Sequence, residues 1–456
     1  MSVGGLPRAM GLRDVVLFNI AAIVGLRWIT TAGKIGPFAL VLWLVAMVAF
    51  FIPSALAVAD LSENDPGEGG LYRWVNSAFG ETHGFLAGWG YWVNNLVYYP
   101  SLLVTTAAIG AYALGPENVG LADNQLFVAV FSLVVLWLAL GLNILGLDVG
   151  KWVQNLGAIG TWIPAVVLIV LGAWVLLKFG SATPLEPSQW VPPDFDYSLL
   201  AFFATMTFGF AGLELIPVLG GEIRDAARTI RRGILISGAL IVFVYIIGTV
   251  AILAALPPET VDITNGVPQA TAAMELRLGL TGITYIVAVM LVIGNLGGVG
   301  AWLAGTARIP FVAGLDRKLP PAFGRVHPKW KSPYVALLVQ GGVATLFVLT
   351  GLLGSTVETA YLILLDMTII LYFIPYLYVF AAYLVLLGSR SGSQAPRKAM
   401  ACMGFLSVLL SIFLAAVPTE QSGSLWLFEF KLWGGVAAFM GVGFWFARRK
   451  SHASVA

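Results

Sequence analysis

Long apolar segments follow one another along the chain and are separated by short polar ones. These segments, each of roughly 20 residues or more, are residues 14–34, 38–60, 83–114, 125–146, 152–178, 197–219, 232–255, 281–312, 334–353, 357–388, 398–417 and 425–447. A helix needs about 20 apolar residues to cross the hydrocarbon core of a membrane, and it satisfies its own backbone there. Barrel strands are shorter. The pattern therefore predicts an all-α membrane protein with 12 transmembrane helices.

The amino-acid composition excludes a soluble domain. Of the 456 residues, 59% are hydrophobic and 11% are charged, whereas a soluble domain has about 25% charged residues. Long Pro- and Gly-rich linkers are missing, so we expect a single membrane domain over residues 1–456. One cysteine, Cys402, and three histidines at helix ends, in loops or in the tail argue against a disulfide, a metal site or any other cofactor. The net charge of +2 gives no indication of nucleic-acid binding.

Basic residues indicate how the predicted helices are oriented. An even number of helices places both termini on one side, and 20 of the 25 Lys and Arg residues fall on that side against 4 on the other. Basic loops stay in the cytoplasm. We therefore expect a multi-pass protein of the cell membrane (inner or plasma) with both termini cytoplasmic. The first segment lacks the features of a cleavable signal peptide, so we expect it to be retained.

The remaining basic residue, Arg27, lies inside the first predicted helix. It follows Val15 by 12 residues, which places it about 18 Å into a core about 30 Å thick. An arginine at such a depth costs about 2.5–3.5 kcal/mol, so it should face protein, water or a ligand. Two interpretations stay open: a structural ion pair with Glu214 or Asp366, or a role in a substrate cavity.

Glycines interrupt two of the predicted helices. Gly25 lies in the first, and Gly209 and Gly212 precede Pro217 in the sixth. Glycine in membrane helices often serves close packing. These two helices correspond, however, if residues 10–178 and 197–388 form inverted five-helix repeats, followed by two additional helices in residues 398–447. Paired interruptions of this kind indicate a transport site, where helix N-termini bind a carboxylate and freed carbonyls bind an ammonium group. An amino acid matches both.

Three stretches resemble the amino acid, polyamine and organocation transporter family. They are ENDPGEGGLYRWVNSAFGETHGF (residues 63–85), similar to the segment before the family's third helix, GGEIRDAARTIRRGI (220–234), similar to its connector after helix 6, and ARIPFVAGLDRKLPPAFGRVHPKWKSPYVA (307–336), similar to the segment between helices 8 and 9. The resemblance covers about residues 10–390. It implies a LeuT-like fold, a five-plus-five inverted repeat with broken helices 1 and 6 around a central site.

The resemblance also implies a substrate site at the two interruptions. The first-helix positions, whose backbone binds a carboxylate in relatives, are Ile23, Val24, Gly25 and Leu26; the sixth-helix positions are Phe208, Gly209, Ala211 and Gly212. Phe208 would act as an aromatic lid. Glu214 matches an acidic position that takes part in proton-linked gating in some relatives.

One position departs from the family pattern. Relatives usually have a small residue where this chain has Arg27, and its Leu-Arg pair is similar to the glutamate/γ-aminobutyrate antiporter branch. By that resemblance Arg27 pairs with a substrate carboxylate. Thr161 stands nearest the place of a lysine that some proton-coupled relatives use, so coupling through a lysine is not expected here.

Polar residues in the third helix complete the candidate site. Of the set Tyr91, Asn94, Asn95, Tyr98 and Tyr99, we predict that Asn95 and Tyr98 contact substrate, although an aromatic belt at the membrane surface would explain some of them. Polyamine carriers that this stretch resembles have an acid near Asn95. The neutral amide weakens a polycation interpretation.

These observations favour a secondary active transporter, a permease or antiporter and not an enzyme. We expect it to move amino acids or related amines across the lipid bilayer by alternating access, with a proton as the candidate coupling ion. The alternatives are a polyamine or cationic-amine carrier, in which an acid holds Arg27 away from the cavity, and, more remotely, an ion channel or a membrane enzyme. Acidic residues within 60–68 and basic residues within 224–232 form either an ion-pair gate or a solvated surface.

Overall fold

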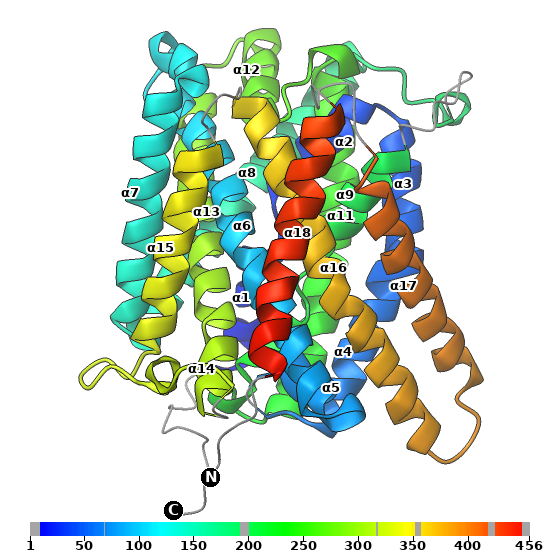
Figure 1. Ribbon diagram of the computed structural model, residues 1–456. Coiled ribbons are helices and arrows are strands. Elements are labelled where there is room, and N and C mark those ends of the chain that lie inside the picture. Colours follow the sequence, from blue (N-terminus) through cyan, green and yellow to red (C-terminus); the bar gives the residue numbers. More distant parts are fainter. Residues whose placement is uncertain are drawn as a thin grey trace, which may run out of the picture.

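The computed structural model describes residues 10–67, 69–191, 200–315, 318–351, 357–417 and 425–448. Within these ranges the chain is built from helices, and one isolated bridge pairs Met10 with Ile223. The long helices lie roughly along one common axis. Helices α5 and α14 are at the lower end of the bundle, and α12 is at the upper end (Figure 1).

The α-helices in chain order are α1 (Leu12–Ile23), α2 (Leu26–Ile35), α3 (Phe38–Ala46), α4 (Ile52–Asn64), α5 (Leu71–Phe79), α6 (Glu81–Ala113), α7 (Gln125–Ile144), α8 (Leu147–Phe179), α9 (Ala201–Gly209), α10 (Leu215–Val218), α11 (Ala226–Ala255), α12 (Gly266–Leu278), α13 (Ile283–Thr306), α14 (Arg308–Leu315), α15 (Tyr334–Gly351), α16 (Val357–Ser389), α17 (Ala395–Leu414) and α18 (Leu425–Arg448). A π-helical turn, η2 (Met47–Phe51), joins α3 to α4, and the 3₁₀ turn η6 (Gly220–Glu222) follows α10.

Eight helical segments of the described chain are long and apolar enough to cross a membrane, and the bent pair α1 and α2 raises the number to nine. Helix α15 qualifies only as a shorter apolar helix over Tyr334–Thr350. Helices lie in all twelve ranges predicted from the sequence. The chain is therefore a multi-pass helical membrane protein, whereas the count of twelve spans and their division into inverted repeats stay predictions.

Helix α6 forms the centre of the bundle. It packs against α5, α7, α13, α15, α16 and α18, and 89% of its most apolar 18-residue window is buried. Outer helices show the opposite, because large apolar side chains such as Leu126 of α7, Leu235 of α11 and Leu406 of α17 are exposed. Apolar side chains on the outside are what a bilayer requires.

Both predicted interruptions are real breaks in helices. Between α1 and α2 the chain bends by 41°, and Val24 and Gly25 are extended. Between α9 and α10 the residues Ala211 to Leu213 are not helical. Gly212 has a φ of +126°, a value that side chains strongly disfavour. The sequence predicted both breaks from these glycines.

We expect Gly212→Ala to lower the free energy of unfolding by about 1–3 kcal/mol, the usual cost of a strained backbone position. A Cβ there would also lie 2.7 Å from Cγ1 of Ile23. Chemical denaturation of the purified protein in detergent measures the change. Gly141→Ala in α7 is the control, because a Cβ there meets nothing within 4 Å; equal effects of the two substitutions would contradict the assignment of strain to Gly212.

Candidate functional site

Arg27 lies in the first turn of α2, directly after the break in the first membrane helix. Its side chain is 7% exposed, and its Nη2 donates a hydrogen bond of 2.8 Å to the hydroxyl of Tyr98. The guanidinium carbon lies 4.2 Å from the ring centroid of Trp28 and 5.1 Å from that of Tyr98. Aromatic faces stabilise a cation in this geometry. Its Nε has no hydrogen-bond partner within the described part of the chain.

One of the two interpretations of Arg27 is an ion pair with an acid in the membrane, which is not formed among the described residues. In the described residues neither Glu214 nor Asp366 makes a salt bridge with the guanidinium. Asp366 is only half-buried in α16. Arg27 is therefore a buried charge that aromatic rings and one phenol solvate, and it lacks a carboxylate partner among the residues that the structure describes.

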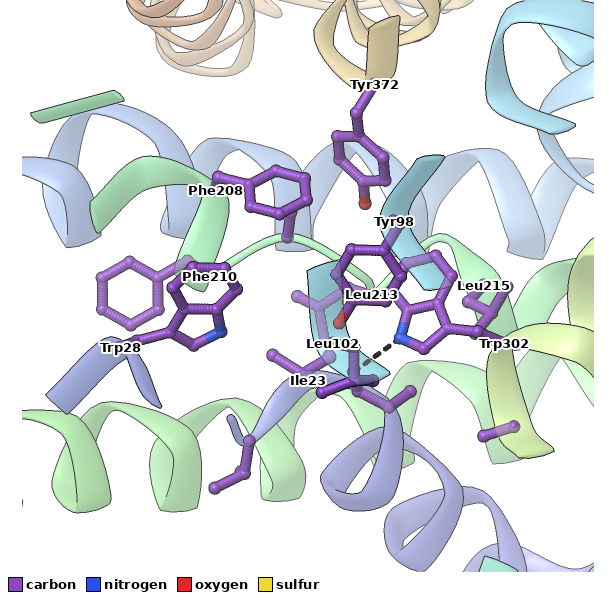
Figure 2. Close-up of a cluster of buried hydrophobic side chains, with 14 of the residues drawn as sticks. Ile23, Trp28, Tyr98, Leu102, Phe208, Phe210, Leu213, Leu215, Trp302 and Tyr372 are labelled. Carbon is purple, nitrogen blue, oxygen red and sulfur yellow. Dashed lines mark hydrogen bonds between the residues drawn. The ribbon is translucent and has the colours of Figure 1, made fainter. Parts of the chain in front are cut away.

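Aromatic rings surround the position next to Arg27. Phe208 makes edge-to-face contacts with Trp28 at 5.6 Å and with Tyr372 at 5.2 Å between ring centroids, and Tyr98 lies 5.3 Å from Trp302. Figure 2 shows Tyr98, Phe208, Trp302 and Tyr372 gathered around the connection between α9 and α10. We call these five residues, Trp28, Tyr98, Phe208, Trp302 and Tyr372, the aromatic box.

Tyr245 of α11 joins the two helix breaks. Its hydroxyl lies 2.6 Å from the carbonyl oxygen of Ile23 and 2.9 Å from that of Gly209, and it accepts a hydrogen bond of 3.2 Å from the Gly25 N–H. A phenol has one proton to donate, so the two carbonyls share it. Trp302 satisfies a further carbonyl, because its Nε1 donates to Ala22 at 2.8 Å. Side chains from α11 and α13 thus replace hydrogen bonds that the breaks remove.

Glu214 is surrounded by phenols. Its carboxylate is fully buried and accepts hydrogen bonds from the hydroxyls of Tyr91 (2.7 Å), Tyr372 and Tyr376, and from the Gly212 N–H (3.1 Å). Four donors therefore serve its two oxygens. We call Glu214 and its three tyrosines the tyrosine cluster. Tyr372 belongs to both groups, so the cluster adjoins the aromatic box.

The predicted first-helix and sixth-helix residues come together. Ile23 lies against Gly212, Gly25 and Gly209 share Tyr245, and Phe208 contacts both Trp28 and Tyr98. Because Val24 and Gly25 are extended, the first N–H groups of α2, those of Leu26 and Arg27, have no preceding helical turn to bond. Ala211, in the sixth-helix break, is buried and donates its N–H to the carbonyl of Phe208.

Asn95 and Tyr98 differ in what they contact. Tyr98 touches Arg27, Phe208 and Trp302, and its contact with substrate stays a prediction. Asn95 is buried but bonds within its own helix, through Nδ2 to the carbonyl of Tyr91 at 2.9 Å. Its Oδ1 has no partner among the described residues. A contact between Asn95 and substrate stays a prediction.

A second polar cluster closes the side of the bundle where α5 and α14 lie. Glu222 and Arg308 form a buried ion pair of 3.1 Å, with side-chain exposures of 0% and 5%. The Glu222 carbonyl accepts the Met10 N–H at 3.1 Å, which ties the segment before α1 to the end of the sixth membrane helix. Burial raises the pKa of the Glu222 carboxyl, and the Arg308 guanidinium partly offsets that rise. The sequence analysis did not single out this pair.

The predicted gate between acidic residues 60–68 and basic residues 224–232 is formed only in part. Glu63 pairs with Arg231 at 2.6 Å, and both side chains are about half exposed. Asp65 pairs instead with Arg73, and Asp60 with Arg390 and Arg397. Glu68 lies outside the described residues.

Four functional candidates escaped the sequence analysis: Trp302, Tyr372, Tyr376 and Tyr245. The sequence signal that could have found them is a phenol or indole inside an apolar segment with another polar residue one helical turn away. Tyr372 and Tyr376, spaced i and i+4, are an example. Such residues are too common near membrane surfaces for the spacing alone to indicate a site.

Two broken helices meet around buried polar groups within a multi-pass helical bundle. This arrangement defines the class of the protein, which is a membrane transporter. Residues 10–429 match the model of the amino acid permease family, and the chain belongs to that family. It is thus a transporter and not an enzyme.

Relatives of known or unknown role resemble the chain over most of its length. An uncharacterized transporter of Legionella pneumophila is 29% identical over 97% of each chain. A probable agmatine/putrescine antiporter of Lactococcus lactis is 24% identical over 91% of this chain and 89% of the relative. A glutamate/gamma-aminobutyrate antiporter of the same species is 24% identical over 82% of this chain and 77% of the relative.

Proposed function

We propose that the protein is a secondary active transporter of amino acids in which Arg27 receives the substrate carboxylate. The observation that carries this proposal is the buried guanidinium without a carboxylate partner in the described chain. Burying a charge without an opposite charge is costly. A carboxylate ligand removes that cost, and the planar guanidinium suits its two oxygens.

The surroundings of Arg27 support the same ligand. The free N–H groups at the start of α2 attract an anion, because a helix N-terminus carries a partial positive charge. The other rings of the aromatic box, those of Phe208, Trp302 and Tyr372, are the ones left to contact an ammonium group. Glu214 is already served by four donors, so in this proposal it does not bind the ammonium group but gains or loses the coupling proton.

The burial of the site supports a proposed cycle of alternating access. The residues around Arg27 are buried, and in this proposal the Glu222–Arg308 pair, with the Met10 backbone bonded to Glu222, covers one approach to them. In the proposed cycle that pair opens on the cytoplasmic side of the cell membrane, where both termini lie. The proposed framework is a five-plus-five inverted repeat (residues 10–178 and 197–388) with two additional helices (398–447).

We expect amino acids to stabilise the purified protein, and their decarboxylated amines to have no effect. A ligand at 100 times its dissociation constant stabilises by about 2.7 kcal/mol. A thermal-shift screen in detergent, in which each amino acid is paired with its amine, measures the difference. Stabilisation by the amines alone would contradict a carboxylate contact with Arg27.

Arg27→Lys tests the residue itself. Lysine keeps the charge but loses the planar fork, so we expect the ligand concentration for half-maximal stabilisation to rise about tenfold or more. Arg73→Lys, at the half-exposed pair with Asp65, is the control and leaves this concentration unchanged. An unchanged ligand response in Arg27→Lys would argue against direct binding.

A second candidate function is the transport of cationic amines. The aromatic box favours it, since such boxes bind cations, and one relative is named a probable agmatine/putrescine antiporter. Against it, the protein's own guanidinium already occupies the ring faces of Trp28 and Tyr98. The paired screen separates the two candidates, because a cation carrier responds to the amines.

A further inference from the structure

A cavity outside the central site opens between α4, α11 and the start of α17. It has a volume of about 500 Å³. Apolar side chains from η2, α4 and α11 line most of it, among them Phe51, Ile52, Leu56, Leu235 and Val242. Its other end is polar, because Asp60, Arg231 and Arg397 close the lining there. Helix α4 packs against both α11 and α17, so it forms the floor of this groove.

From its polar end the groove follows the axis of α11 toward the middle of the membrane. Arg231 lies in the second turn of α11, and Val242 lies 11 residues further along the same helix. At 1.5 Å per residue the apolar part extends about 16 Å. One leaflet of a membrane has nearly the same depth, because the hydrocarbon core of both leaflets is about 30 Å thick. Helix α4 ends at the polar end, on the side of the bundle where α5 lies (Figure 1).

The polar end carries a surplus of positive charge. Two carboxylates, Asp60 and Glu63, face three arginines, because Arg390 and Arg397 both approach Asp60 and Arg231 pairs with Glu63. Asp60 is already satisfied, since it accepts hydrogen bonds from Tyr383 at 2.8 Å and from Arg390 at 3.2 Å. Arg397 is the more distant partner at 3.6 Å. Its Nη1 also donates a hydrogen bond of 3.3 Å to Oε1 of Gln394. With 44% of its side chain exposed, the guanidinium can still contact another anion.

We propose that this groove binds one anionic phospholipid of the adjacent leaflet. The headgroup phosphate lies between Arg231 and Arg397, and an acyl chain lies along α4 and α11. Small side chains, Ala55 and Ala59 of α4 with Gly238 and Ala239 of α11, leave the room for that chain. The combination of a leaflet-deep apolar groove with two arginines at its mouth distinguishes this site from an ordinary lipid-facing surface.

The test compares three probes on the purified full-length protein in detergent: phosphatidylglycerol, phosphatidylcholine and inorganic phosphate. We expect phosphatidylglycerol to raise the thermal unfolding midpoint, and the other two to have no comparable effect. Equal stabilisation by phosphatidylcholine would overturn the role of the arginines. Stabilisation by inorganic phosphate alone would overturn the role of the groove.

Paired variants assign the effect to the two arginines. We expect Arg231→Gln with Arg397→Gln to raise the half-maximal phosphatidylglycerol concentration about 30-fold, which corresponds to about 1 kcal/mol per basic residue. Arg232→Gln with Lys398→Gln removes the same charge from neighbouring exposed positions that do not line the groove. Equal losses in both double variants would overturn the site. The fold tolerates the first pair, because Arg231 is in an exposed pair and Asp60 keeps Arg390.

A bulky side chain in the groove tests the acyl chain separately. Ala239→Trp fills the cavity from an exposed lining position, and we expect it to abolish the phosphatidylglycerol shift. Ile236→Trp, on the same helix but outside the lining, is the matched control and retains the shift. A full shift in Ala239→Trp would contradict an acyl chain in the groove.

Discussion

Glu222→Ala is expected to lower the free energy of unfolding by about 3–5 kcal/mol, the usual cost of removing one partner from a buried ion pair. The substitution leaves the Arg308 guanidinium, which is 5% exposed, without its carboxylate. Among the described residues, Arg308 then keeps its hydrogen bond to the Ala304 carbonyl. Chemical denaturation of the purified protein in detergent measures the loss.

An exposed ion pair on the same side of the bundle provides the control. Glu63→Ala removes the partner of Arg231, and the two side chains are 50% and 48% exposed. Solvated pairs contribute about 0–1 kcal/mol, so we expect a small loss. The combined variant Glu222→Leu with Arg308→Met should recover much of the stability, because no unpaired charge stays buried. Similar losses for Glu222→Ala and Glu63→Ala would contradict the buried character of the first pair.

Glu214→Gln is the second change with a large expected effect. The side chain keeps its shape, but the amide has one oxygen where the carboxylate has two. The Gly212 N–H cannot turn around, so the amide oxygen has to face it, and the NH₂ group then faces the hydroxyls of Tyr91 and Tyr372. Those hydroxyls lose their acceptor. Each unsatisfied buried donor costs about 1–3 kcal/mol, so we expect a loss of about 2–5 kcal/mol in unfolding free energy.

Uptake into proteoliposomes at several external pH values adds a functional measurement. A glutamine cannot exchange a proton, so under the proposed coupling the pH dependence of uptake becomes flat in Glu214→Gln. Tyr376→Phe removes one donor and keeps the charge, so it should reduce stability less and preserve the pH dependence. Tyr378→Phe is its matched control, since this phenol contacts the exposed His83. An unchanged pH profile in Glu214→Gln would exclude this residue as the coupling group.

Much of the site could be located from the sequence, because its signals are local. A basic residue inside an apolar segment stands out wherever it occurs, and Arg27 did so. Glycines in two spans that correspond under the predicted repeat indicated both breaks. The sixth-helix resemblance named Phe208, and the polar residues of the third helix named Tyr98. In the structure Tyr98 bonds to Arg27 and Phe208 packs on Trp28, whereas their contact with substrate stays a prediction.

The partners of the two buried charges could not be predicted in the same way. Charge complementarity allowed a pair of Arg27 with Glu214 or Asp366, yet Arg27 and Glu214 are bonded to different groups. Tyr245, Tyr372 and Tyr376 reach the site from helices far along the chain. Their approach depends on helix rotation and tilt, which the packing of whole helices decides.

By itself, the sequence determined that the chain is a helical membrane protein, where its apolar helices lie and where two of them break. These properties depend on hydrocarbon thickness and on backbone freedom, which act over one segment at a time. Only the tertiary structure decided that phenols solvate Glu214, that aromatic rings hold Arg27 and that Glu222 is buried with Arg308. The reason is that a buried charge takes the partners that neighbouring helices bring within hydrogen-bond reach, and helix contacts are set by the fit of many side chains at once.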